Sequence, residues 1–323
     1  MAGRGTKRAP PQKRISETGP VGRGQTGFLR SGHRFGYLQF DTAWSQAQMA
    51  DLPDSSTMLP CCTKVCVGSV AFSLMPFWAA LAGYVAPMAA TRTETITAAD
   101  GATFDGFLGL PESGSGPGVL VIQEIFGVNT YIQQVCKRLA ALGYVAMAPD
   151  CFHRQGAGFA VDRTGPEAVG EGIGKATKHD AELGVADLGA ALTHLRGLSE
   201  VGGGKVGVTG FCFGGLMTYL VAKNFNPDAA VSYYGSNIAN LLDGVTEQLT
   251  CPILFHFGDN DPFLPNSDVD KIREATAAMD NVTVRQYWMA GHAFDNAFAP
   301  FYQPHQANEA WGHTAAFFAR HLG

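Results

Sequence analysis

The chain has 323 residues, enough for one large domain with a sizeable extension or for two ordinary domains. Hydrophobic residues make up 46% of the chain and charged residues 16%, which excludes disorder over most of its length. Residues 65–323 hold fourteen Lys/Arg against twenty-four Asp/Glu. This part is therefore acidic, and we predict no nucleic-acid-binding surface on it.

Residues 1–90 are interpreted as an N-terminal extension. Residues 1–36 are rich in Gly, Arg, Pro and Ser and show little apolar periodicity, which predicts disorder. Residues 65–90 carry no charge and are long enough for a membrane helix, although glycine and proline interrupt them. Three interpretations stay open: a signal or membrane anchor, an extension of unknown role, or translated sequence upstream of a true start at Met88. Membrane association is expected only if this segment is made and retained.

The seven cysteines are scattered along the chain, and their odd number makes a poor disulfide framework. None of their spacings suggests a zinc site. Free thiols in a reducing compartment are the default interpretation, so we expect a cytoplasmic protein without a metal or organic cofactor.

From Thr91 onward, short apolar strands alternate with helical stretches. Two opening strands at 94–97 and 103–110 are separated by a turn signal at 99–101. The elements predicted after them are strands at 118–123, 144–148, 205–209, 229–234, 253–257 and 282–287, and helices at 129–142, 181–198, 214–223, 268–279 and 305–321. This alternation predicts a single α/β domain over residues 91–323, with a mostly parallel sheet and helices on both faces.

The clearest chemical motif is Gly210-Phe211-Cys212-Phe213-Gly214, which follows an apolar strand and opens a helix. It matches the G-x-nucleophile-x-G elbow of hydrolases, with cysteine in place of serine. At a helix N-terminus the dipole favours the thiolate form of Cys212. The backbone N–H of Phe213 is a candidate oxyanion donor. Taken alone, the pentapeptide fits a buried core cysteine equally well.

Candidate partners follow in the chain order of α/β-hydrolases, which is nucleophile, acid, base. Asp261 lies in an acidic loop after the strand at 253–257, and His292 follows the strand at 282–287. His292 would act as the base, and Asp261 would hold its ring in the required tautomer. Because three motifs occur in this order, each at a predicted strand end, the sequence favours a Cys-His-Asp hydrolase with the α/β-hydrolase fold.

A further segment, Gln123–Asn129, follows the first long parallel strand. Its backbone is expected to provide the second oxyanion donor, the N–H of Ile125. Glu124 could hydrogen-bond the thiol of Cys212 and keep it neutral, because a nearby negative charge disfavours the thiolate. A solvated or capping glutamate is the alternative.

Residues 91–323 resemble the dienelactone hydrolase (carboxymethylenebutenolidase) family. The resemblance rests on six ordered stretches: QEIFGVN at 123–129, APD with HRQG at 148–156, GKVGVTGFCFGG at 204–215, SYYG at 232–235, FHFGDNDPFLP at 255–265 and AGHAF at 290–294. It implies that Cys212 is the nucleophile, His292 the base and Asp261 its partner, and that Glu124 interacts with the resting thiol. It also implies that Arg154 holds a substrate carboxylate and that Tyr233 lines the pocket.

Two positions depart from the family pattern. Ala293 and Asn296 stand where well-known members have a serine and a second arginine that help to hold the carboxylate. The substrate could therefore be a different lactone or ester, or another group could bind its carboxylate.

We expect a monomer. The resemblance implies an enzyme that opens small, carboxylate-bearing enol lactones through an acyl-enzyme. Two alternatives remain from the residues. One is a broader carboxylesterase or thioesterase of the same fold, and the other is a non-catalytic, redox-sensing protein in which Cys212 is simply a reactive thiol.

Overall fold

The computed structural model describes Met1, residues 90–163 and residues 165–323. The predictions for the apolar segment at 65–90 and for the rest of the extension fall almost entirely outside these residues. The domain boundary near residue 90 therefore stays a prediction. Among the residues described, no helix is both long and apolar enough to cross a bilayer.

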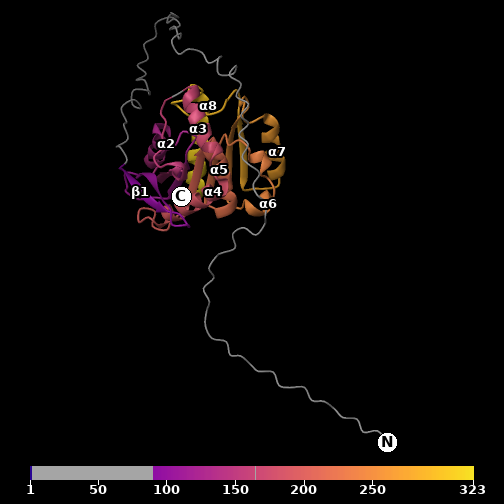
Figure 1. Cartoon of the computed structure of the whole chain (residues 1–323). Helices are drawn as coiled ribbons and strands as arrows, with labels where there is room; N and C mark the ends of the chain where they lie inside the picture. The colour runs from indigo at the N-terminus through magenta and orange to yellow at the C-terminus, as the bar shows by residue number, and fades with distance from the viewer. Residues whose placement is uncertain (2–89, 164) are drawn as a thin grey trace, which may run out of the picture. The chain divides into compact units, whose positions relative to one another are not determined.

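The centre of the domain is an eight-stranded sheet (Figure 1). The order of its strands is β1-β2-β4-β3-β5-β6-β7-β8. The strands β1 and β2 are antiparallel to their neighbours, and all other pairs are parallel. In chain order the strands are β1 (Thr91–Thr97), β2 (Thr103–Gly109), β3 (Gly118–Ile122), β4 (Val145–Pro149), β5 (Val206–Phe211), β6 (Ala229–Tyr233), β7 (Ile253–Gly258) and β8 (Val282–Tyr287).

Helices connect the parallel strands. The described ones are α2 (Thr130–Ala141), α3 (Pro166–Thr177), α4 (Ala181–Gly197), α5 (Phe213–Phe225), α6 (Val245–Gln248), α7 (Asn266–Thr276) and α8 (Pro304–Leu322), with short 3₁₀ turns η1 (His153–Gln155) and η2 (Ile238–Asn240). Two of them show how local sequence sets their starts. Asn129 caps α2 by accepting from the N–H of Ile132, and Asp180 caps α4 by accepting from the N–H groups of Glu182 and Leu183.

Two hydrophobic cores cover the two faces of the sheet. Leucines and valines of α4, α5 and α7 pack into one core with Leu120 and Val208. The other core joins α2 and α8 to Val119 and Val231. The strands β3, β5, β6 and β7 are buried along their whole length, as expected for parallel strands covered on both sides. In Figure 1, α4 and α5 lie side by side on one face.

The predicted α/β-hydrolase architecture is confirmed, and each predicted strand and helix has its counterpart. The helix α3 was not predicted. Because β3, β5, β7 and β8 run parallel, their carboxyl ends meet at one edge of the sheet. The loops that leave this edge carry the candidate site.

Candidate active site

Cys212 lies on a sharp turn between β5 and α5, with φ 55° and ψ −114°. Residues other than glycine rarely adopt this backbone conformation, and such strain is typical of a nucleophile elbow. The turn depends on two glycines. A Cβ on Gly210 would lie 2.2 Å from the carbonyl oxygen of Gly214, and one on Gly214 would lie 2.3 Å from that of Ile122. The glycines of the motif are therefore a steric requirement of the turn.

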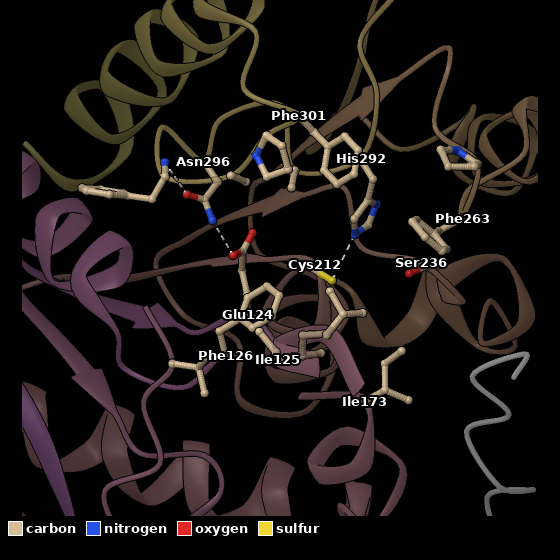
Figure 2. A pocket seen from close by; sticks show the side chains of 18 of the residues that line it. Glu124, Ile125, Phe126, Ile173, Cys212, Ser236, Phe263, His292, Asn296 and Phe301 are labelled. Atoms are coloured by element: carbon tan, nitrogen blue, oxygen red, sulfur yellow. Dashed lines mark hydrogen bonds between the residues drawn. The ribbon is translucent and has the colours of Figure 1, made fainter. Parts of the chain in front are cut away.

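The structure brings the three predicted catalytic side chains together. His292 Nε2 lies 3.0 Å from Cys212 Sγ (Figure 2), and His292 Nδ1 lies 2.8 Å from Asp261 Oδ2. The other carboxylate oxygen of Asp261 accepts from the N–H of Phe263 at 2.8 Å. Each of the three residues follows a different strand, β5, β7 or β8, at the carboxyl edge of the sheet. This is the geometry of a nucleophile, a base and the group that orients the base.

The charge state of His292 follows from its two partners. Burial alone would lower its pKa, but the negative charges of Asp261 and Cys212, each hydrogen-bonded to the ring, raise the pKa well above its usual value. The arrangement therefore favours the charged form of His292 beside the sulfur of Cys212.

Two backbone N–H groups lie next to the elbow. Ile125 and the residue before it, Glu124, line the pocket. The start of α5 packs closely against the end of β3, because a Cβ on Gly214 would lie 2.5 Å from the carbonyl oxygen of Gln123. Among the residues described, the N–H groups of Ile125 and Phe213 donate to no protein acceptor. Both are thus available to an oxyanion, although their role stays a prediction.

Glu124 is buried beside the triad, with 2% of its surface exposed. Its carboxylate accepts from Asn296 Nδ2 at 2.8 Å (Figure 2) and from the hydroxyl of Tyr234 at 3.5 Å. Burial raises its pKa to about 7, despite the nearby His292 and the bond from Asn296. The sulfur of Cys212 pairs with His292 and the carboxylate of Glu124 with Asn296, so the predicted bond between the thiol and Glu124 is absent from this arrangement of the described residues.

Glu124→Gln is expected to change how stability depends on pH. In the folded protein Glu124 keeps its proton up to about pH 7, whereas the unfolded chain releases it near the ordinary value of 4.5. Between these values folding takes up a proton, so the wild type loses stability as the pH rises, by roughly 3 kcal/mol in total. The neutral amide of the variant has no such loss. Urea unfolding at about pH 5 and about pH 9 measures the difference. Parallel pH curves for the two proteins would contradict the raised pKa.

Arg154 does not reach the pocket, so its predicted role in binding a carboxylate is corrected. Its guanidinium forms a two-pronged pair with Asp187, with both bonds at 2.7 Å, and a third bond to Asp100 at 2.9 Å. The short turn η1 that carries Arg154 packs on β2 and α4. The ring of His153 in this turn stacks on Phe104 of β2 and also pairs with Asp187 of α4. The arginine is engaged in a structural ion pair.

Tyr233 does not line the pocket either, and this prediction is also corrected. Its ring is fully buried against Phe211, and its hydroxyl lies 2.6 Å from Thr314 of α8. The next residue, Tyr234, follows the end of β6 with a positive φ of 37° and lies on the side of the site, with its ring centroid 5.2 Å from that of His292.

A pocket of about 610 Å³ opens in front of Cys212 and His292. Its walls come from the loop after β3, from α3, from the start of α5 and from the loops after β7 and β8. Two contributors to the pocket were not predicted from the sequence: the helix α3, and Asn296 as the partner of Glu124. Nowhere in residues 90–163 and 165–323 do three or more His, Cys, Asp or Glu side chains gather as a metal site would require.

A parallel sheet with a strained nucleophile turn after β5, an acid after β7 and a histidine after β8 defines an α/β-hydrolase. Comparison with known proteins narrows the class. Residues 104–322 match the sequence model of the dienelactone hydrolase family. The chain belongs to this family, and it is a hydrolase.

Relatives and solved structures agree with this assignment. A carboxymethylenebutenolidase of Pseudomonas putida is 36% identical over 63% of this chain and 86% of its own length. A carboxymethylenebutenolidase of Pseudomonas sp. (strain P51) is 34% identical over 71% of this chain and 95% of its own length. The crystal structure of a putative dienelactone hydrolase from Klebsiella pneumoniae, 28% identical, superposes with a TM-score of 0.61 over 72% of this chain and 99% of that one.

Proposed function

We propose that this protein hydrolyses a lactone or carboxylic ester through a triad of Cys212, His292 and Asp261 and a covalent acyl-enzyme. The observation that carries the proposal is the pair of contacts of His292, one to Cys212 Sγ at 3.0 Å and one to Asp261 at 2.8 Å. The relatives named carboxymethylenebutenolidase support a small enol lactone of the dienelactone type as a substrate.

In the first step the thiolate sulfur of Cys212 bonds to the carbonyl carbon, and the carbonyl oxygen becomes an oxyanion. When the carbonyl re-forms, the bond to the ring or alkoxy oxygen breaks. This oxygen takes a proton from the His292 imidazolium, which leaves a thioester and a neutral imidazole. For an enol lactone the released enol becomes a ketone.

In the second step neutral His292 accepts a proton from a water molecule, whose oxygen attacks the thioester carbon. The carbon–sulfur bond then breaks, so the product leaves as a carboxylic acid and the thiolate–imidazolium pair is restored. Asp261 keeps the ring orientation through both steps. In this mechanism the N–H groups of Ile125 and Phe213 stabilise the oxyanion of each step.

A broader carboxylesterase or thioesterase activity is the second candidate. The pocket volume of about 610 Å³ favours it, because pockets of this size accommodate ligands as large as drugs. Faster turnover of p-nitrophenyl acetate than of any lactone would favour this candidate. Because either reaction needs a reduced thiol at Cys212, we place the reaction in the cytoplasm.

Alkylation of the full-length protein with iodoacetamide tests the proposal. Hydrolysis of dienelactone and of p-nitrophenyl acetate is expected to disappear in step with modification of the peptide that carries Cys212, and substrate should slow both changes. Peptide mass spectrometry and residual activity are measured on the same samples. Complete modification of Cys212 with hydrolysis retained would contradict the proposal, and it would favour a redox-sensing thiol.

A further inference from the structure

The pocket offers few cations to a substrate anion. Besides Cys212, its titratable lining consists of three carboxyl groups, one guanidinium and the catalytic imidazole, which belong to Glu124, Asp162, Asp268, Arg163 and His292. Like charges brought together in a poorly solvated space repel each other strongly. A substrate carboxylate would therefore need a cation in the pocket that is free to bind it.

The two cations of the lining are both engaged. His292 is held between Asp261 and the sulfur of Cys212. Arg163 pairs with Glu171 on the outside of α3, where both side chains are about half exposed, at 51% and 42%. An exposed guanidinium that already has a partner adds little attraction for a second anion, because water and salt screen it.

The position next to the sulfur is occupied by a carboxyl group. Glu124 lies there, and the amide of Asn296, one of the polar side chains of the lining, donates to Glu124 at 2.8 Å. An anion bound here would face this carboxyl group directly. Binding it would require Glu124 to stay protonated or the pair with Asn296 to break.

Most of the remaining wall is apolar. It includes two aliphatic side chains of α3, one of α5 and three phenyl rings near the mouth: Val169, Ile173, Leu216, Phe263, Phe298 and Phe301. The three rings are 42%, 51% and 45% exposed, and Figure 2 shows Phe263 and Phe301 on the side of His292. Exposed apolar surface gathered around a cavity marks a place where an apolar ligand binds.

We infer that the pocket takes an uncharged ester or lactone with a large apolar group, and that it discriminates against substrates that carry a free carboxylate. The inference rests on the proposed hydrolysis by Cys212 and adds the class of substrate. It replaces the carboxylate-bearing lactone that the family resemblance implies. The apolar group would lie among the phenyl rings of the mouth, with its ester carbonyl at the sulfur.

A pair of esters that differ only in a terminal group tests the inference. Wild-type protein is assayed with p-nitrophenyl hexanoate and with the half-ester mono-p-nitrophenyl adipate, which carries a carboxylate in place of the terminal methyl group. We expect kcat/KM to be about 10-fold or more higher for the hexanoate. Added salt should narrow this ratio because it screens the repulsion. An equal or faster rate with the half-ester would overturn the inference.

A matched pair of variants on α7 separates charge from shape. Asp268 and Asp270 each pair with a cation three residues on, Lys271 and Arg273, but Asp268 lines the pocket whereas Asp270 lies outside it and is 63% exposed. Asp268→Asn should raise the ratio of kcat/KM for the half-ester to kcat/KM for the hexanoate about 2-fold or more. Asp270→Asn should change neither rate. Equal effects of both variants on both esters would contradict a role of the pocket charge.

A second pair of variants tests the role of the apolar wall in binding the substrate. Phe301→Ala is expected to raise KM for p-nitrophenyl 4-phenylbutyrate several-fold, because the phenyl group of the substrate loses a packing partner. Trp288→Ala removes a ring that is 76% exposed and lies outside the pocket, and it should leave KM unchanged. The opposite ranking would overturn the assigned position of the apolar group. If the wild type hydrolysed none of these esters, or if Cys212→Ala kept full activity, the proposed hydrolysis itself would be refuted.

Discussion

Replacing Cys212 by alanine is expected to lower kcat/KM for ester and lactone hydrolysis by about 10⁴-fold or more, as when a nucleophile is removed from other covalent hydrolases. The variant keeps the pocket and the two candidate oxyanion donors, but no atom in it can form the acyl-enzyme. Its fold should be retained, since the side chain is small and only partly buried. Steady-state rates with p-nitrophenyl hexanoate and dienelactone, together with circular dichroism, measure both effects.

Cys151→Ala provides the control for this variant. Cys151 is also a free and partly buried thiol, but it lies outside the pocket, and its sulfur contacts the carbonyl oxygen of Pro149 at 3.7 Å. We expect this variant to keep the wild-type rate. A Cys212→Ala protein as active as the wild type would remove Cys212 from the mechanism.

Asp261→Asn is expected to lower kcat by roughly 10²- to 10⁴-fold with little change in KM. The amide takes away the charge that raises the pKa of His292, and its N–H₂ group can hold the ring in the wrong tautomer. The imidazolium should then lose its proton at lower pH. We therefore expect the alkaline limb of the pH–rate profile, where this proton is lost, to move to lower pH in the variant.

The matched control is Asp259→Asn, which changes the other acid before Pro262 in the same loop. The backbone of Asp259 is hydrogen-bonded to Tyr287 and Asn266, but its carboxylate does not contact the triad. Its rate and pH profile should match those of the wild type. If Asp259→Asn were the slower variant, the acid of the triad would be assigned to the wrong residue.

The candidate triad was predictable because each member belongs to a short local motif at a strand end, and because α/β-hydrolases fix the chain order of the three. The geometry of the elbow could be predicted from its sequence, because the turn requires glycine at positions 210 and 214, where any Cβ would collide with the backbone. Parallel strands then bring the three loops to one edge. No knowledge of the strand order was needed for this step.

The helix α3 was not predicted because its sequence has a low helix propensity. Its sequence, PEAVGEGIGKAT, contains three glycines, which weaken an isolated helix. One of them is required by packing: a Cβ on Gly172 would lie 2.8 Å from the carbonyl oxygen of Ile125. Tertiary contact with the loop after β3 therefore favours a residue that local propensity disfavours. The apolar wall made by Val169 and Ile173 was missed with it.

The directions of Arg154 and Tyr233 could not be predicted from their motifs. A family motif fixes where a residue lies along the chain, but its partners fix where the side chain points. Arg154 turns toward Asp187, and Tyr233 faces α8 whereas Tyr234 faces the site. The pairing of Asn296 with Glu124 likewise joins residues 172 positions apart, which no local pattern reveals.

The separation of the catalytic residues along the chain also bears on folding. His292 is 80 residues from Cys212 and 31 from Asp261, and the three meet only when β5, β7 and β8 have paired through β6. Non-local parallel pairing is a slow step in folding. Catalytic activity should therefore be among the last properties that a refolding chain recovers, later than its helical signal. Hydrolysis of a chromogenic ester would then report the fraction of molecules whose sheet is fully assembled.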